Sequence, residues 1–240
     1  MDRPSEHWQT LTAWSLRLVR DIDLDGAERN DKLAAAGRLT DAVITLDAGD
    51  TSSPALVKTA LAKDTNVVAR QMREPFVSWL DSARDRAAAA LTVLRTDPTP
   101  SGVDTFLAEV PDEVLHGTGV RLGVASLLLS AFDPTGMPPW RANTVEKGYR
   151  LIGYSKPEPQ ASDGERYDTF LVFLDLVVEA AAEAGVELRD RLDAQGLLWA
   201  LIHALGSAKA AAGMPGGERR SAFAGNEGPD NDPSARHAGA

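Results

Sequence analysis

The chain has 240 residues, of which 43% are hydrophobic and 25% charged, with no cysteine and a net charge of -10. This balance allows one globular domain or two small ones and excludes a collagenous, a wholly disordered or a membrane-embedded protein. The lack of cysteine excludes disulfides, thiolate zinc sites and iron–sulfur clusters, and the acidic charge means that contact with nucleic acid requires a local basic patch. Without an apolar run long enough for a membrane span and without a signal-peptide pattern, we expect a cytoplasmic protein with no membrane partner.

Apolar residues recur with helical spacing through the first part of the chain. The pattern predicts helices at residues 6–22, 28–46, 54–61 and 75–94, with residues 66–68 extended. The strongest break is Thr96-Asp97-Pro98-Thr99-Pro100-Ser101-Gly102, because two prolines among turn-forming residues cannot continue a helix. The break predicts a boundary between an N-terminal helical half, residues 1–96, and a C-terminal helical half, residues 101–205.

The second half repeats the helical pattern around one irregular loop at residues 133–139. We expect helices at residues 103–109, 119–132, 162–184 and 188–205, and a further helix that begins near Asn143, where Glu146 follows at capping-box spacing. Residues 206–240 contain 7 Gly and 3 Pro, which predicts a disordered C-terminal tail. The predicted fold is therefore all-α, a multi-helix array of two packed helical halves followed by a disordered tail.

Catalytic and metal-binding signatures are lacking. There is no Gly-rich loop that ends in Lys-Ser or Lys-Thr, no Gly-x-Ser-x-Gly elbow, and no pair of histidines at metal-binding spacing among the 4 histidines. Asp21-Ile22-Asp23-Leu24-Asp25-Gly26 matches the first half of a calcium loop, but Lys32 stands where the bidentate carboxylate belongs. We therefore expect no catalytic residue, no metal and no cofactor.

One basic stretch, residues 140–156, stands out in this acidic chain, with four basic residues against one acidic. Arg141, Lys147, Arg150 and Lys156 could contact phosphates while Trp140 or Tyr154 stacks on a base, which makes these six residues the candidate site for nucleic acid or a partner. The alternative is a solvated helix face whose aromatic side chains lie in the core.

A set of segments between Trp8 and Leu205 occurs in an order that is typical of one protein class. They resemble a helical region found ahead of the motor domain in bacterial AAA+ proteins of the methylation-dependent restriction (McrBC-type) class. The segments are Glu28-Arg29-Asn30-Asp31-Lys32-Leu33, Asn66-Val67-Val68, Phe76-Val77-Ser78-Trp79-Leu80, Ser126-Leu127-Leu128-Leu129-Ser130-Ala131-Phe132-Asp133-Pro134, Pro138-Pro139-Trp140-Arg141-Ala142-Asn143-Thr144, Tyr149-Arg150-Leu151-Ile152-Gly153-Tyr154 and Leu188-Arg189-Asp190-Arg191-Leu192-Asp193-Ala194-Gln195.

The resemblance implies a non-catalytic recognition or accessory module in bacterial defence, stand-alone or truncated before the motor, which binds DNA or an AAA+ NTPase or nuclease subunit. It carries over no catalytic residue. Arg189, Asp190, Arg191 and Asp193 form a second candidate cluster, either an interaction site or a helix cap with salt bridges. The alternative function is a protein-interaction or assembly module that binds no nucleic acid. A contiguous positive patch would favour recognition, and an exposed apolar patch would favour docking.

Overall fold

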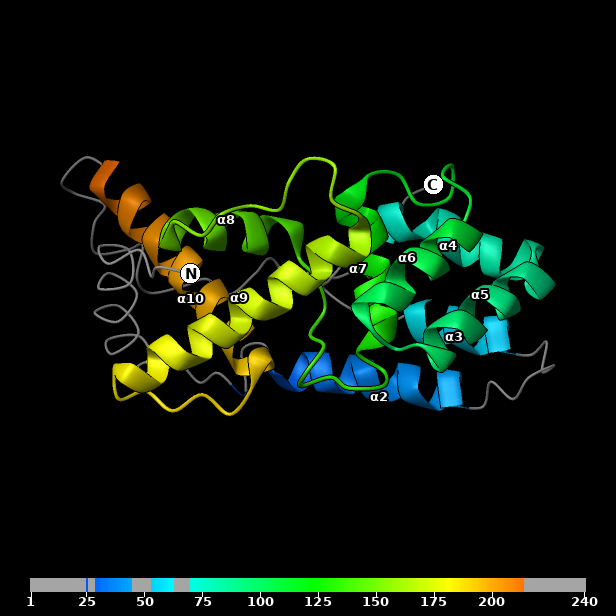
Figure 1. Ribbon diagram of the computed structural model, residues 1–240, viewed down its shortest axis with the longest axis horizontal. Helices are drawn as coiled ribbons and strands as arrows, with labels where there is room; N and C mark the ends of the chain where they lie inside the picture. The colour runs from blue at the N-terminus through cyan, green and yellow to red at the C-terminus, as the bar shows by residue number, and fades with distance from the viewer. Residues whose placement is uncertain (1–24, 26–28, 45–52, 63–69, 214–240) are drawn as a thin grey trace, which may run out of the picture. The chain divides into compact units, whose positions relative to one another are not determined.

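The computed structural model describes residue 25 and residues 29–44, 53–62 and 70–213 (Figure 1). All regular elements in these ranges are helical, which confirms the all-α prediction for the described part of the chain. They are α2 (Asn30–Ile44), α3 (Ser53–Ala62), α4 (Arg70–Ser82), α5 (Arg84–Thr96), α6 (Pro100–Glu109), α7 (Thr118–Leu129), α8 (Ala142–Ile152), α9 (Asp163–Glu183) and α10 (Arg191–Gly213). The predicted helix at residues 6–22, the extended segment at 66–68 and the tail beyond residue 213 lie outside the described residues.

The long helix predicted at residues 75–94 is two helices, α4 and α5. They meet at Ala83, whose φ of -126° and ψ of 48° leave the helical region. The helix also begins earlier than expected, because α4 starts at Arg70 and contains Pro75 in its interior. Of the two prolines in the predicted break, Pro98 lies between two helices and Pro100 lies within one. Pro100 opens α6 from the first helical position, where its missing N–H costs nothing, and Thr99 is the N-cap.

Two other boundaries differ from their predictions. The N-cap of α8 is Arg141, without a side-chain capping bond, so the capping box expected at Asn143 does not form. The backbone carbonyl of Arg141 accepts from the N–H groups of Thr144 and Val145, both at 2.9 Å. At the other end of the chain, α10 continues to Gly213, although a tail is predicted from Gly206.

One hydrophobic core extends from Leu39 to Leu201, on both sides of the predicted boundary near residue 97. Helix α7 lies at its centre, because every residue from Leu122 to Ala131 is buried, including Ser126 and Ser130. The chain forms two compact units, residues 1–202 and residues 203–240. The hydrogen bonds, ion pairs and ring contacts of the two candidate sites lie within the first unit.

The first turn of α9 is fixed against α6. Ser162 and Glu165 form a capping box, and the Asp104 carboxylate on α6 accepts from the Ser162 hydroxyl at 2.6 Å and from the Gly164 N–H at 2.8 Å. A Cβ at Gly164 would come within 2.3 Å of the backbone oxygen of Pro100, so only glycine allows this approach. From there α9 runs past α8 (Figure 1). The Phe173 ring of α9 meets Tyr149 of α8 edge-on, with 4.8 Å between the centroids.

Candidate nucleic-acid interface

Helix α8 divides the basic stretch into a buried side and an exposed side. Val145, Tyr149 and Ile152 are at most 2% exposed and face the core. The exposed side carries Lys147 and Arg150, one helical turn apart, together with Asn143 and Glu146. Gly153 ends the helix in the left-handed region, with a φ of 69°, and the exposed Lys156 follows. We call Asn143, Glu146, Lys147, Arg150 and Lys156 the α8 face.

The aromatic residues of the stretch are turned inward. Trp140 is 7% exposed, and its ring meets Phe170 of α9 edge-on at 5.3 Å between centroids. Tyr154 is half-buried and packs against Tyr149 and Phe173, at 5.3 and 5.0 Å. The structure therefore leaves Lys147, Arg150 and Lys156 exposed and places Trp140, predicted as a stacking residue, in the core. Arg141 is half-buried at the N-cap of α8.

Buried side chains hold the segment that leads into α8, residues 136–140. The Arg191 guanidinium donates to the Gly136 carbonyl at 2.8 Å, and the Tyr167 hydroxyl donates to the Pro138 carbonyl at 3.0 Å. The Gln195 amide donates to the Pro139 carbonyl at 2.5 Å. The backbone N–H of Trp140 donates to the hydroxyl of Ser126 at 2.7 Å. Because these partners come from α7, α9 and α10, they fix the backbone that leads into the α8 N-terminus.

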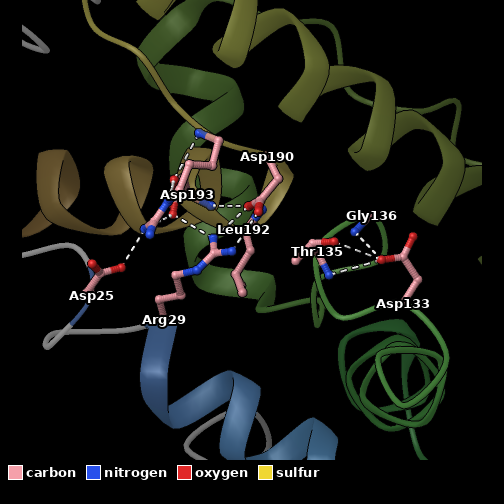
Figure 2. A network of polar contacts seen from close by, with 9 residues as sticks. Asp25, Arg29, Asp133, Thr135, Gly136, Asp190, Leu192 and Asp193 are labelled. Carbon is pink, nitrogen blue, oxygen red and sulfur yellow. Dashed lines mark hydrogen bonds and ion pairs between the residues drawn. The ribbon is translucent and has the colours of Figure 1, made fainter.

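The second candidate cluster lies at the beginning of α10 (Figure 2). The Asp190 carboxylate accepts from the N–H groups of Leu192 and Asp193, at 3.0 and 3.1 Å, and so caps the helix. Figure 2 shows the guanidinium of Arg29 reaching from the N-terminal side of α2 to both Asp190 and Asp193. Arg189 binds Asp193 at 2.7 and 2.9 Å and also pairs with Asp25. The contacts of this cluster are those of a helix cap with salt bridges.

Arg191, the remaining member of the second cluster, points to a different neighbour. Its guanidinium binds both oxygens of Asp175 on α9, at 2.6 and 2.7 Å, in addition to the Gly136 carbonyl. The hydrogen bond with Asp175 raises the pKa of Arg191 above its ordinary value. Arg191 therefore links α9, α10 and the segment at 136–140.

The charges of the cluster shift one another's pKa values. Burial acts to raise the pKa of Asp193, which is 3% exposed, but hydrogen bonds from Arg189 and the charge of Arg29 lower it below its ordinary value. A hydrogen bond with Asp190 likewise raises the pKa of Arg29. Both ions are thus held in their charged forms.

Burial raises the pKa of Tyr154 on the aromatic side of α8, and the nearby charge of Asp168 raises it further.

Sequence reasoning missed the residues that organise these sites. In the sequence, Arg29 belongs to a segment of the family resemblance and carries no other signal. No local pattern identifies Ser126, Tyr167 or Gln195 as a hydrogen-bond partner of a backbone segment far away in the sequence. The one available signal was a polar residue on an otherwise apolar helix face, since a buried polar group must find a hydrogen bond. That rule predicts that a partner exists without saying where it lies.

The described residues also bear on three other kinds of site, namely an apolar docking surface, a metal site and a membrane span. The large hydrophobic side chains exposed there are Leu56 and Val172, at 41% and 44%, on α3 and α9. Within the same ranges, no group of three or more His, Asp or Glu side chains is arranged to hold a metal ion. None of the described helices is both long and apolar enough to cross a membrane.

Comparison of the chain with known protein families, with curated proteins and with solved structures gives no match.

Proposed function

We propose that the chain is a non-catalytic recognition module of the kind that accompanies restriction-type AAA+ NTPases in the bacterial cytoplasm, and that it binds DNA through the α8 face. The observation that carries the proposal is the exposure of Lys147, Arg150 and Lys156 while the apolar side of the same helix is buried. Cations on a helix that the core holds in place can neutralise phosphates without any rearrangement of the fold.

The surface of the described residues also bears on the choice between recognition and docking. A docking face for a partner usually shows a contiguous apolar patch of a few hundred Å². The exposed large hydrophobic residues found here, Leu56 and Val172, stand on different helices. This observation favours the polar α8 face as the contact surface, and docking on an NTPase or nuclease subunit is the second candidate.

The chain's acidic balance sets the strength of binding that we expect. With a net charge of -10, the long-range field repels DNA, so the local cations act mainly at contact distance. Glu146 on the α8 face and Asp168 on the neighbouring helix weaken the local potential further. Binding should therefore be weak and detectable only at low salt.

The experiment compares the wild type with the double variant Lys147→Glu/Arg150→Glu in binding to duplex DNA at about 50 mM salt. Both side chains are exposed and lie opposite Val145 and Ile152, so the variant should keep the wild-type melting temperature. We expect it to lose binding, and replacement of each contact should lower the slope of log affinity against log salt by about 0.9.

A control variant makes the same change of charge elsewhere. Arg84 and Arg86 are exposed on α5, and Arg84→Glu/Arg86→Glu should bind duplex DNA much better than the α8 variant does. Equal losses in the two variants would show that only net charge matters. If the wild type binds neither single- nor double-stranded DNA at low salt, recognition is wrong and docking on a protein partner replaces it.

A further inference from the structure

The aromatic residues around the α8 face are not available to stack on bases. Among the described residues, all Phe, Tyr and Trp side chains are buried or half-buried. Trp140 is buried at 7% exposure, and its backbone N–H is tied to Ser126 while the preceding carbonyl is tied to Gln195. The ring itself packs edge-on against Phe170 in the core, so it would have to leave this buried contact to meet a base.

Tyr154 is half-buried, and its ring also packs toward the interior. Its ring lies against Tyr149 and Phe173, both at most 2% exposed. The residues that reach the surface on the α8 face are cations, an amide and one carboxylate, namely Lys147, Arg150, Lys156, Asn143 and Glu146. These groups can bind phosphate oxygens or base edges, but they cannot provide the aromatic platform on which proteins bind unpaired bases.

From this arrangement we infer that the α8 face takes duplex nucleic acid, which it holds by the phosphate backbone, and that it does not bind single strands by stacking. The inference rests on the proposed function and narrows it. A duplex presents one negative charge per about 1.7 Å of its axis, so several phosphates lie within reach of the side chains of one short helix. A single strand offers a lower charge density, and without stacking the face gains little else from it.

The test separates base stacking from charge. Wild type and the variant Lys147→Gln/Arg150→Gln are titrated with a duplex, with an oligothymidine strand and with an abasic strand of equal length, all at about 50 mM salt. Two quantities are compared. The ratio of the two proteins' affinities for one probe reports the contribution of Lys147 and Arg150, and the ratio of the wild type's own affinities for the oligothymidine and abasic strands reports stacking on bases.

We expect the wild-type-to-variant ratio to be largest for the duplex. We expect the wild type to bind the oligothymidine and abasic strands with affinities that agree within about twofold, because stacking contributes nothing. A wild-type-to-variant ratio larger for oligothymidine than for the duplex would overturn the inference. So would a wild-type affinity about tenfold higher for the oligothymidine strand than for the abasic strand, since stacking one base contributes about that much. Both results leave the proposed function standing. If the wild type binds none of the three probes, the proposed function fails, and this inference fails with it.

Discussion

The guanidinium of Arg29 donates to both carboxylate oxygens of Asp190, at 2.9 and 2.8 Å, although the two residues are 161 positions apart in the sequence. A third bond, at 2.8 Å, goes from the same guanidinium to Asp193. Arg29 precedes α2, and Asp190 caps α10, so this pair ties the beginning of one helix to the beginning of another.

Replacement of Arg29 by Leu should destabilise the fold by about 3 kcal/mol, because Asp193 then loses a cationic partner in a nearly dry environment. Arg29→Lys should recover only part of this loss, since a lysine cannot make the two parallel bonds to Asp190. Urea unfolding measures both variants. The exposed Lys58, which pairs with Asp81, provides the control, and Lys58→Gln should leave the midpoint unchanged. If Arg29→Leu were as neutral as this control, the cluster would contribute nothing to stability.

Asp193 should make the stability depend on pH on the acid side. Its pKa in the folded chain is below the ordinary value of about 3.9, so the unfolded chain binds the proton more readily. The contribution is therefore present above about pH 4 and is lost as the pH falls through the folded-state pKa. We expect the difference in unfolding free energy between wild type and Asp193→Asn to shrink between about pH 6 and about pH 3. A difference that stayed constant over this range would show that Asp193 is not held as a carboxylate.

Gly164→Ala should weaken the junction of α6 and α9 by about 1 to 3 kcal/mol, in spite of alanine's higher helix propensity. The new Cβ would lie 2.3 Å from the Pro100 oxygen and 2.6 Å from a carboxylate oxygen of Asp104, so the two helices would have to separate. Gly37 on α2 is the matched control, because a Cβ there meets nothing within 4 Å. Gly37→Ala should stabilise the chain slightly. Thermal melting of both variants checks the opposite signs.

Tyr167→Phe should cost about 1 to 3 kcal/mol, because the Pro138 carbonyl loses the hydroxyl that donates to it in the core. Burial raises the pKa of Tyr167 above its ordinary value of about 10, so its neutral form stabilises the fold below that pH and this contribution is lost as the pH rises further. The Phe variant should therefore lose less stability than the wild type above about pH 10. Hydrogen exchange should also quicken at the Trp140 amide, one peptide unit beyond the released carbonyl. An unchanged exchange rate there would argue that Tyr167 does not hold this segment.

The sequence predicted the ends of helices well where a proline or a glycine stands at the break. The prolines near residue 98 and Gly185, whose φ is 77°, interrupt the chain where the sequence suggested. The division between α4 and α5 carries no such signal, because Ser82-Ala83-Arg84 contains neither glycine nor proline. In the same way, Asn143 and Glu146 have the spacing of a capping box, yet the chain begins the helix at Ala142.

The candidate sites were likewise predictable only where a local pattern determines the arrangement. The period of α8 separates Lys147 and Arg150 from Val145 and Ile152, because amphipathic spacing follows from helix geometry alone. It does not decide whether Trp140, which precedes the helix, points inward. That choice depends on the contact of its ring with Phe170, which only the folded chain brings to it.

The segment at residues 136–140 has a consequence for folding kinetics. Its backbone groups are paired with side chains of α7, α9 and α10, so the segment gains these bonds only after all three helices have assembled. Interactions completed after the transition state have φ-values near zero, and their loss speeds unfolding without slowing folding. The polar anchors of this segment should therefore influence mainly the lifetime of the folded chain rather than the rate at which it is reached.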